Sequence, residues 1–322
     1  MMRDAGSSRR RGRRGAALLA ALAMLVAISL VALEMGTASR ASRLAAANAL
    51  DRAAARAAAH AGLAVARARL RAALRANLLT AGAPAAPDPW APLVGIAIAP
   101  AGIGALEYEV ELRDAGRRLD LNRADETQLG RVLAQLGVDA ARAERAAQGI
   151  ADWRDGDDLR RGRGAERADY IRLGRPVLPG NAPFRNADEL REVVGVDAAL
   201  FAALRPLVTT VGLSRVNLNA ADGPVLAALP GMSPECVALV LRRRRAGQRI
   251  GSPGELAAAL SASARERLLR AMPELLERST STTDVVEVVV TVRDAAGVTR
   301  ERLEALVARD AGPRVVWTRM TP

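Results

Sequence analysis

The sequence contains no lysine, one histidine and one cysteine, and aromatic residues make up only 2% of its 322 residues. Because Cys236 is alone, no disulfide can form within the chain. Because His60 is the only histidine, the body of the chain has no Ser-His-Asp or Cys-His arrangement and no histidine-based metal site. No pairing of a nucleophile with a base is visible, so we expect a protein that is not an enzyme.

The formal net charge of +12 is unevenly distributed. Residues 1–80 hold fourteen arginines against three acids, whereas the rest of the chain holds 33 arginines against 32 acids. A strongly basic protein suggests a nucleic-acid partner, but here the basic excess belongs to the N-terminal segment and the body is near neutral. The charge therefore points to membrane topology rather than to DNA binding, for which aromatic residues that stack on bases are also scarce.

The N-terminal segment has the composition of a membrane anchor. Six arginines fall within the first fifteen residues, and the eighteen residues of Ala16–Leu33 then carry no charge. A helix of that length spans roughly 27 Å, close to the ~30 Å core of a bilayer. The arginine cluster is expected to stay on the cytoplasmic side, which places the bulk of the chain across the membrane.

Three kinds of N-terminal signal compete for this segment. The first is a plain signal anchor. The second is a secretory signal peptide, for which Ala38–Ala41 is a poor cleavage site because it contains Arg40. The third follows from Gly15, because an Arg-Gly junction directly before an apolar helix resembles the leader of type IV prepilins, which is cut after the glycine. Cleavage there would leave Ala16 first and Ala20 fifth, where most pilins have glutamate.

The remaining sequence predicts an α+β protein. A proline-free helix over Thr37–Leu79 continues the apolar segment, and four prolines then break it within residues 81–92. Alternating or valine-rich patterns predict strands at Leu106–Leu112, Asp284–Arg293 and Pro313–Arg319. The plan is pilin-like: a long N-terminal helix packs on a small antiparallel sheet, and a large α-helical domain, residues 119–278, is inserted between the strands.

The helical region contains an internal repeat. Leu121–Asp125 matches Leu218–Asp222, and Asn186–Leu190 matches Ser252–Leu256. Asp125 and Asp222 each precede a leucine-rich helical pattern and are expected to cap those helices. The paired motifs lie farther apart in the first copy, whose extra residues fall near 152–183. We therefore expect two SAM-like or helix-hairpin-helix-like repeats, the first with a polar insertion.

The second copy resembles the helix-hairpin-helix module of DNA-uptake and repair proteins. In that module a Pro-Gly-x-Gly hairpin offers backbone N–H groups to a phosphate. Here Pro230 and Gly231 are followed by Met232 and Ser233, so the second glycine is missing, and Pro234 removes a donor. A membrane-anchored DNA-binding or DNA-uptake protein is the alternative function, and a purely structural hairpin is the competing interpretation.

The polar insertion holds candidate metal ligands. Residues 152–158 (DWRDGDD) and 164–170 (GAERADY) bring carboxylates together on glycine-bearing loops, and calcium takes six to eight oxygen ligands. The first cluster lacks the closing glutamate of an EF-hand loop. A solvated loop held by arginine–carboxylate pairs is the alternative, because five arginines lie among the acids: Arg154, Arg160, Arg161, Arg163 and Arg167.

These motifs jointly resemble the minor pseudopilin K family of type II secretion systems, which also lacks the early glutamate. The series continues with PxNxPF at Pro179–Phe184, ELR at Glu189–Arg191 and VNLNAA at Val216–Ala221. The resemblance implies a pilin fold with an inserted helical domain that binds calcium. It implies metal ligands among Asp155, Asp157, Asp158, Glu166 and Asp169, with Asp152 as a further candidate. It also implies processing between Gly15 and Ala16.

The resemblance further implies a location and partners. It predicts a single-pass subunit of the bacterial inner membrane, with a cytoplasmic N-terminus and a periplasmic body, at the tip of the pseudopilus. The implied partners are minor pseudopilins I and J, the major pseudopilin, the prepilin peptidase and secreted exoproteins, and DNA is not expected. The corresponding divisions are a leader (1–15), a transmembrane and stalk helix (16–80), the first part of the pilin-like domain (81–118), the helical domain (119–278) and C-terminal strands (279–322).

Overall fold

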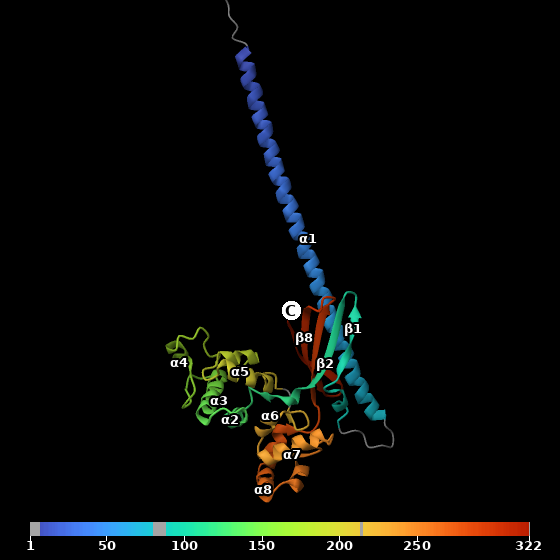
Figure 1. The fold of residues 1–322 in the computed structure, drawn as a ribbon, viewed down its shortest axis with the longest axis vertical. Helices are drawn as coiled ribbons and strands as arrows, with labels where there is room; N and C mark the ends of the chain where they lie inside the picture. The colour runs from blue at the N-terminus through green and yellow to red at the C-terminus, as the bar shows by residue number, and fades with distance from the viewer. Residues whose placement is uncertain (1–6, 80–87, 213–214, 322) are drawn as a thin grey trace, which may run out of the picture. The chain divides into compact units, whose positions relative to one another are not determined.

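The computed structural model describes residues 7–79, 88–212 and 215–321, and the chain divides into two units, Met1–Ala58 and Ala59–Pro322. Helix α1 (Ser7–Leu79) belongs to both units (Figure 1). From Ala21 onward it is long and apolar enough to cross a bilayer, and none of its most apolar eighteen-residue window is buried. The Ser29 hydroxyl donates to the Leu25 carbonyl (2.8 Å), so this polar group is satisfied without water, as a lipid environment requires.

The second unit is built on a five-stranded antiparallel sheet with the order β1-β2-β7-β8-β9. The strands are β1 (Ala97–Ile103), β2 (Leu106–Asp114), β7 (Val285–Asp294), β8 (Thr299–Arg309) and β9 (Pro313–Thr321). The helical region enters the chain between β2 and β7, which are neighbours in the sheet. The predicted α+β class, with a helical domain inserted between strands, is therefore confirmed.

The last part of α1, residues 59–79, packs on this sheet through a face of small residues. Ala59, Gly62 and Ala66 are buried, and Leu70 continues the same face. A Cβ atom at Gly62 would lie only 2.6 Å from Val290 Cγ1 of β7. The helix therefore approaches the sheet closely because this position has no side chain.

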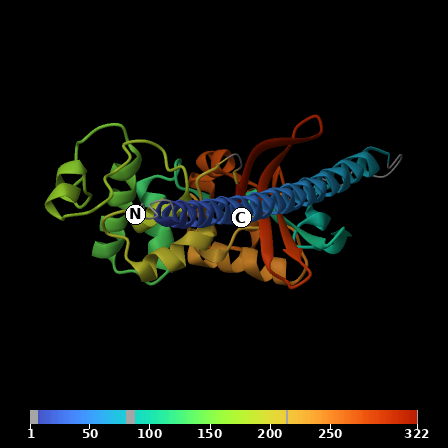
Figure 2. The ribbon, with the colours of Figure 1, turned by 90° about the horizontal axis from the view of Figure 1, so that it is seen from above.

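Short helices and 3-10 turns make up the inserted domain. They are α2 (Glu126–Gln135), α3 (Ala140–Arg154), α4 (Arg167–Arg172), η3 (Ala187–Arg191), α5 (Ala198–Leu204), η4 (Arg205–Leu207), α6 (Gly223–Ala227), α7 (Pro234–Arg245), η5 (Pro253–Ala259), α8 (Ala262–Arg270) and α9 (Met272–Arg278). Figures 1 and 2 show these helices, green to orange, gathered to one side of the sheet. Their buried apolar side chains form one continuous core that includes both copies of the repeat.

The internal repeat is visible in matching hydrogen bonds. Two-residue parallel strand pairs close the copies: β3 (Leu119–Asp120) with β4 (Val208–Thr209), and β5 (Val216–Asn217) with β6 (Ser279–Thr280). In the first copy the Asn122 side chain accepts from the Phe184 N–H (2.8 Å) and donates to the Phe184 carbonyl (3.0 Å). In the second copy Asn219 bonds in the same way to Ile250 (both 2.8 Å). Each repeated asparagine therefore joins the start of its copy to the middle.

The two predicted helix caps behave differently. Asp125 caps α2 as predicted, because its side chain accepts from the Gln128 N–H (2.8 Å). For Asp222 the predicted position is right, because it is the N-cap residue of α6, but the predicted hydrogen bond is wrong, because its side chain makes no capping hydrogen bond. Pro224 occupies the second position of α6 and removes one of the two N–H groups that such a cap binds.

The polar insertion lies at one defined point of the repeat. In the first copy residues 155–183 separate the end of α3 from Phe184. In the second copy only residues 246–249 separate the end of α7 from the corresponding Ile250. The insertion therefore extends a short turn of the repeat without interrupting its core.

Candidate metal centre

Three carboxylates from the two edges of one loop meet at the end of α3. Asp152 lies in the last turn of α3, Asp155 directly follows that helix, and Glu166 directly precedes α4. One oxygen of each lies within 4.8 Å of the others. The end of one helix and the start of the next therefore bring together acids that are separated in the sequence.

Aromatic residues, which are scarce in this chain, hold the loop in place. The Trp153 ring stacks on Phe184 (centroids 6.0 Å apart, planes at 12°) and lies 5.8 Å from the Tyr170 ring. All three rings are buried, and the Tyr170 hydroxyl accepts from the Val194 N–H (2.9 Å). Trp153 directly follows Asp152 in the sequence. The packing of the three rings therefore holds the backbone at Asp152 in place.

Glu166 is buried without a partner. The residue is only 3% exposed, and neither carboxylate oxygen has a hydrogen-bond partner among the residues the structure describes. Burial raises the pKa of Glu166 to about 7, and the neighbouring charges of Asp152 and Asp155 act in the same direction. A buried carboxylate without a donor or a cation is costly, so this side chain points to a bound cation.

Arg161 supplies one positive charge to the group. Its Nη1 donates to Asp152 Oδ1 (2.7 Å) and to Asp155 Oδ2, and its Nε donates to Glu126 Oε1 at the start of α2 (2.8 Å). Burial raises the pKa of Asp152, although the hydrogen bonds from Arg161 oppose that shift. One guanidinium can balance the negative charge of only one of the three clustered carboxylates. Among the described residues, the charge of Glu166 has no positively charged partner.

A glycine makes room for the Asp152 carboxylate. A Cβ atom at Gly164 would overlap Asp152 Oδ2. At Gly162, in the same loop, the nearest atom to such a Cβ is Gln148 Oε1 at 3.9 Å, an ordinary contact. The space that the Asp152 carboxylate occupies therefore depends on the glycine at position 164 and not on the glycine at position 162.

The other predicted ligands lie outside this group of three. Asp157 and Asp158 each accept a hydrogen bond from within the insertion (2.8 and 3.0 Å). Asp169 accepts from the Glu166 N–H (3.0 Å) and pairs with Arg172. These three acids shape the loop, whereas the gathered carboxylates face one another.

The gathered groups fit calcium. Carboxylate oxygens are the ligands this ion prefers. Asp155 Oδ1 and both oxygens of Glu166 are buried and without hydrogen bonds among the described residues. Asp152, which the sequence offered only as a further candidate, stands beside them at the centre. These three residues would hold the ion, whose charge would compensate the excess of carboxylates.

The hairpin of the second copy offers an anion few donors. The Ser233 side chain caps α7 by accepting from the Cys236 N–H (3.2 Å), and Pro234 has no N–H. Gly231 has the positive φ of a hairpin turn (73°), as has Gly137 in the first copy (77°). The helix start is therefore already capped by the chain itself, and the geometry does not favour the DNA-binding alternative.

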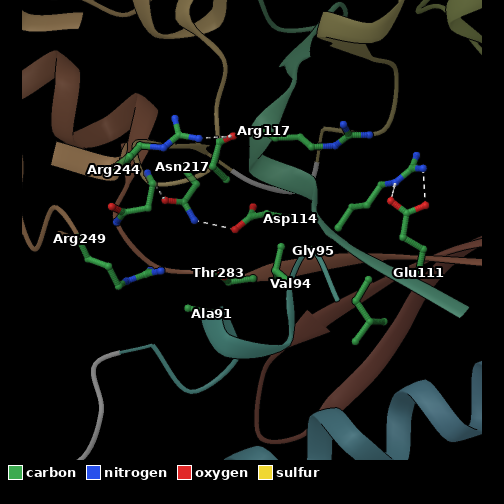
Figure 3. A pocket seen from close by; sticks show the side chains of 14 residues that line it. Ala91, Val94, Gly95, Glu111, Asp114, Arg117, Asn217, Arg244, Arg249 and Thr283 are labelled. Atoms are coloured by element: carbon green, nitrogen blue, oxygen red, sulfur yellow. Dashed lines mark hydrogen bonds and ion pairs between the residues drawn. The ribbon is translucent and has the colours of Figure 1, made fainter. Parts of the chain in front are cut away.

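A separate hollow of about 370 Å³ lies where the inserted domain joins the sheet (Figure 3). Several of the polar groups that line it make hydrogen bonds or ion pairs within the protein. The Asn217 amide donates to Asp114 of β2 (2.6 Å), and Arg249 pairs with the buried Asp88 (2.6 Å). These contacts tie the second repeat to the sheet domain, so we assign this hollow a structural role.

The predicted processing residues, Gly15 and Ala16, lie within α1. The structure describes the backbone there, and the surroundings of their side chains, like residues 1–6, fall outside the described part of the chain. Processing therefore stays a prediction from the sequence.

Residues 110–212 match the family model for the first domain of type II secretion system protein K. Protein K of Dickeya chrysanthemi is 34% identical over 106 residues, covering 33% of this chain and 27% of that protein. Protein K of Klebsiella pneumoniae is 33% identical over 116 residues, covering 35% and 36%. The chain thus spans about a third of the length of these relatives. The resemblance to protein K that the motifs indicated is confirmed.

A solved structure extends the likeness to most of the chain. It is a chain of the GspK-GspI-GspJ complex of the type 2 secretion system of enterotoxigenic Escherichia coli, with a TM-score of 0.60 and 20% identity. The match covers 88% of this chain and 99% of that chain. At this identity the likeness establishes the fold.

Proposed function

We propose that this chain is a non-enzymatic minor pseudopilin that caps or initiates the pseudopilus tip of a type II secretion system. The fold carries the proposal: an apolar N-terminal helix continues onto a five-stranded sheet, and a duplicated helical domain enters between β2 and β7. That arrangement matches the GspK-containing complex over nearly the whole chain. The matching segment 110–212 lies across the point where the helical domain is inserted.

The N-terminal segment supports insertion in the bacterial inner membrane with the N-terminus in the cytoplasm. The arginine-rich leader precedes the apolar stretch, and the folded body follows it. Prepilin peptidase would cut after Gly15 and leave Ala16 as the first residue. The retained helix then serves both as the anchor and as the contact with other subunits.

The partners we propose are minor pseudopilins I and J and the major pseudopilin, with secreted exoproteins as the cargo served at the tip. The matched solved structure is a complex of GspK with GspI and GspJ, which supports the first two. The test is co-expression of the full chain with the I and J pseudopilins of its own bacterium in detergent, followed by size-exclusion chromatography. We expect one stable complex with all three subunits. Separate elution of this chain would contradict the proposal.

We also propose a calcium site at Asp152, Asp155 and Glu166. The buried, unpartnered oxygens of Glu166 are the supporting observation. A ligand that binds the folded chain alone raises its melting temperature with concentration. We expect millimolar calcium to raise the melting temperature of the full chain in detergent relative to chelator, and magnesium to raise it less. No shift would contradict the site and would leave the pseudopilin assignment intact.

A further inference from the structure

The Arg161 side chain lies between solvent and the cluster of three carboxylates, Asp152, Asp155 and Glu166. It is 35% exposed, whereas the side chain of Asp152 is fully buried and that of Asp155 is 24% exposed. Its Nη1 bonds to Asp152 and Asp155, and its Nε bonds to Glu126 outside the group. The side chain thus joins the buried acids to a partly exposed acid at the start of α2.

A cation bound to the same carboxylates would lie close to the Arg161 guanidinium, which already bonds to one oxygen of Asp152 and one oxygen of Asp155. Asp152 Oδ1 and Asp155 Oδ2 each accept from its Nη1. Two cations that share these carboxylates repel each other strongly at such short distances. The bond from Nε to Glu126, whose side chain is 43% exposed, gives the guanidinium an anionic partner on the outer side.

We propose that Arg161 is a built-in competitor for the metal ion. Its guanidinium holds Asp152 and Asp155 together when no metal is bound, and it moves outward to Glu126 when the ion enters. This inference rests on the calcium site proposed above. The competition weakens calcium binding, and it keeps the loop folded when calcium is absent.

Calorimetric titration of calcium into the full chain in detergent tests the competition. Arg161→Met keeps an unbranched apolar side chain at this position and removes the charge. We expect calcium to bind this variant about tenfold more tightly, the change that roughly 1.4 kcal/mol of removed competition produces. Arg163→Met is the matched control, because Arg163 lies in the same loop and pairs with Glu144 instead (2.8 Å). Its affinity should stay within about twofold of the wild type.

Equal or weaker calcium binding by Arg161→Met would overturn the inference while leaving the calcium site in place. Absence of calcium binding by the wild type would overturn both. A second measurement needs no variant. Phenylglyoxal labels exposed guanidinium groups, and peptide mass spectrometry reports the rate at each arginine. Arg161 should react faster when calcium is present and Arg163 should not change, whereas a slower or unchanged rate at Arg161 would contradict its displacement.

Discussion

The Glu166 carboxyl couples proton binding to stability. Its pKa is raised from 4.5 to about 7 by burial and by neighbouring acids, so the folded chain holds this proton more tightly than the unfolded chain does. At a pH between these two pKa values, the unfolded chain has already released the proton and the folded chain still holds it. The stability of the metal-free protein should therefore fall as pH rises through this window, by up to about 3 kcal/mol from this group.

The Glu166→Gln side chain is neutral at every pH, so this variant should not lose stability as the pH rises through that window. Without metal, we expect the variant to be more stable than the wild type at pH 8 and about equally stable at pH 4.5. Urea unfolding with chelator measures both points, and Glu144→Gln, at an exposed position of α3, is the control that should not change. A variant less stable than the wild type at pH 8 would show that Glu166 is ionised and compensated in the folded chain.

A substitution at Gly164 tests whether the Asp152 carboxylate needs the space beside this glycine. Gly164→Ala places a methyl group where Asp152 Oδ2 lies, so we expect it to abolish the rise in melting temperature on adding calcium. Gly162→Ala has space for its methyl group and should keep the full rise. Thermal unfolding with calcium and with chelator compares the two variants. Equal calcium responses would mean that Asp152 is not a ligand.

Among the elements, the contact of α1 with the sheet depends on one missing side chain. Gly62→Val would force the helix away from Val290 and should destabilise the protein by about 1–3 kcal/mol. Ala64→Val adds a β-branched residue to the same helix at an exposed position and should cost far less. Urea unfolding of both variants measures the difference. Equal costs would place the effect in helix propensity rather than in packing.

The strands show what the sequence could predict about the sheet. Strand β2 was predictable because its alternating pattern has the period of two that a half-buried strand requires, and β7 was predictable because it is rich in valine, which favours strands. Strand β8 has the composition of a helix, ERLEAL, and is extended because it pairs along its length with β7. Strand β1 contains Pro100 and small residues, and its pairing with β2 is irregular there. Both segments are strands because they pair with neighbouring strands of the sheet, which their local sequence does not indicate.

At the scale of the whole molecule, the insertion and its acids were predictable, but their grouping was not. Repeat spacing located the insertion, and its acids indicated a metal site. Which acids converge depends on where α3 ends and α4 begins, and those boundaries bring Asp152 and Glu166 together while Asp169 turns toward Arg172. Arg161 was one arginine among five in the sequence, and only the fold shows that it reaches the centre.

We expect the leader of this chain to be removed before the subunit assembles. We expect the mature chain to start at Ala16, and a methylated amine there would identify prepilin peptidase. Gly15→Val should leave the leader attached, whereas Gly12→Val, within the leader, should be cut normally. N-terminal mass spectrometry of protein from cells with an intact secretion system measures all three. A mature chain that starts after Leu33 would contradict the retained anchor.

The fifth residue after that expected cut bears on the proposed position of the subunit at the fibre tip. In ordinary pilins the glutamate at this position is thought to meet the N-terminal amine of the subunit ahead, whereas this chain has Ala20. A subunit at the tip has none ahead, so a carboxylate here would remain unpaired in an apolar setting, at a cost. Ala20→Glu should therefore leave secretion equal or reduced, measured as exoprotein released by cells that carry the variant as their only copy. Ala23→Glu, three residues along the same apolar stretch, is the control for simply burying a charge. A clear increase in secretion with Ala20→Glu alone would place this subunit within the fibre and not at its tip.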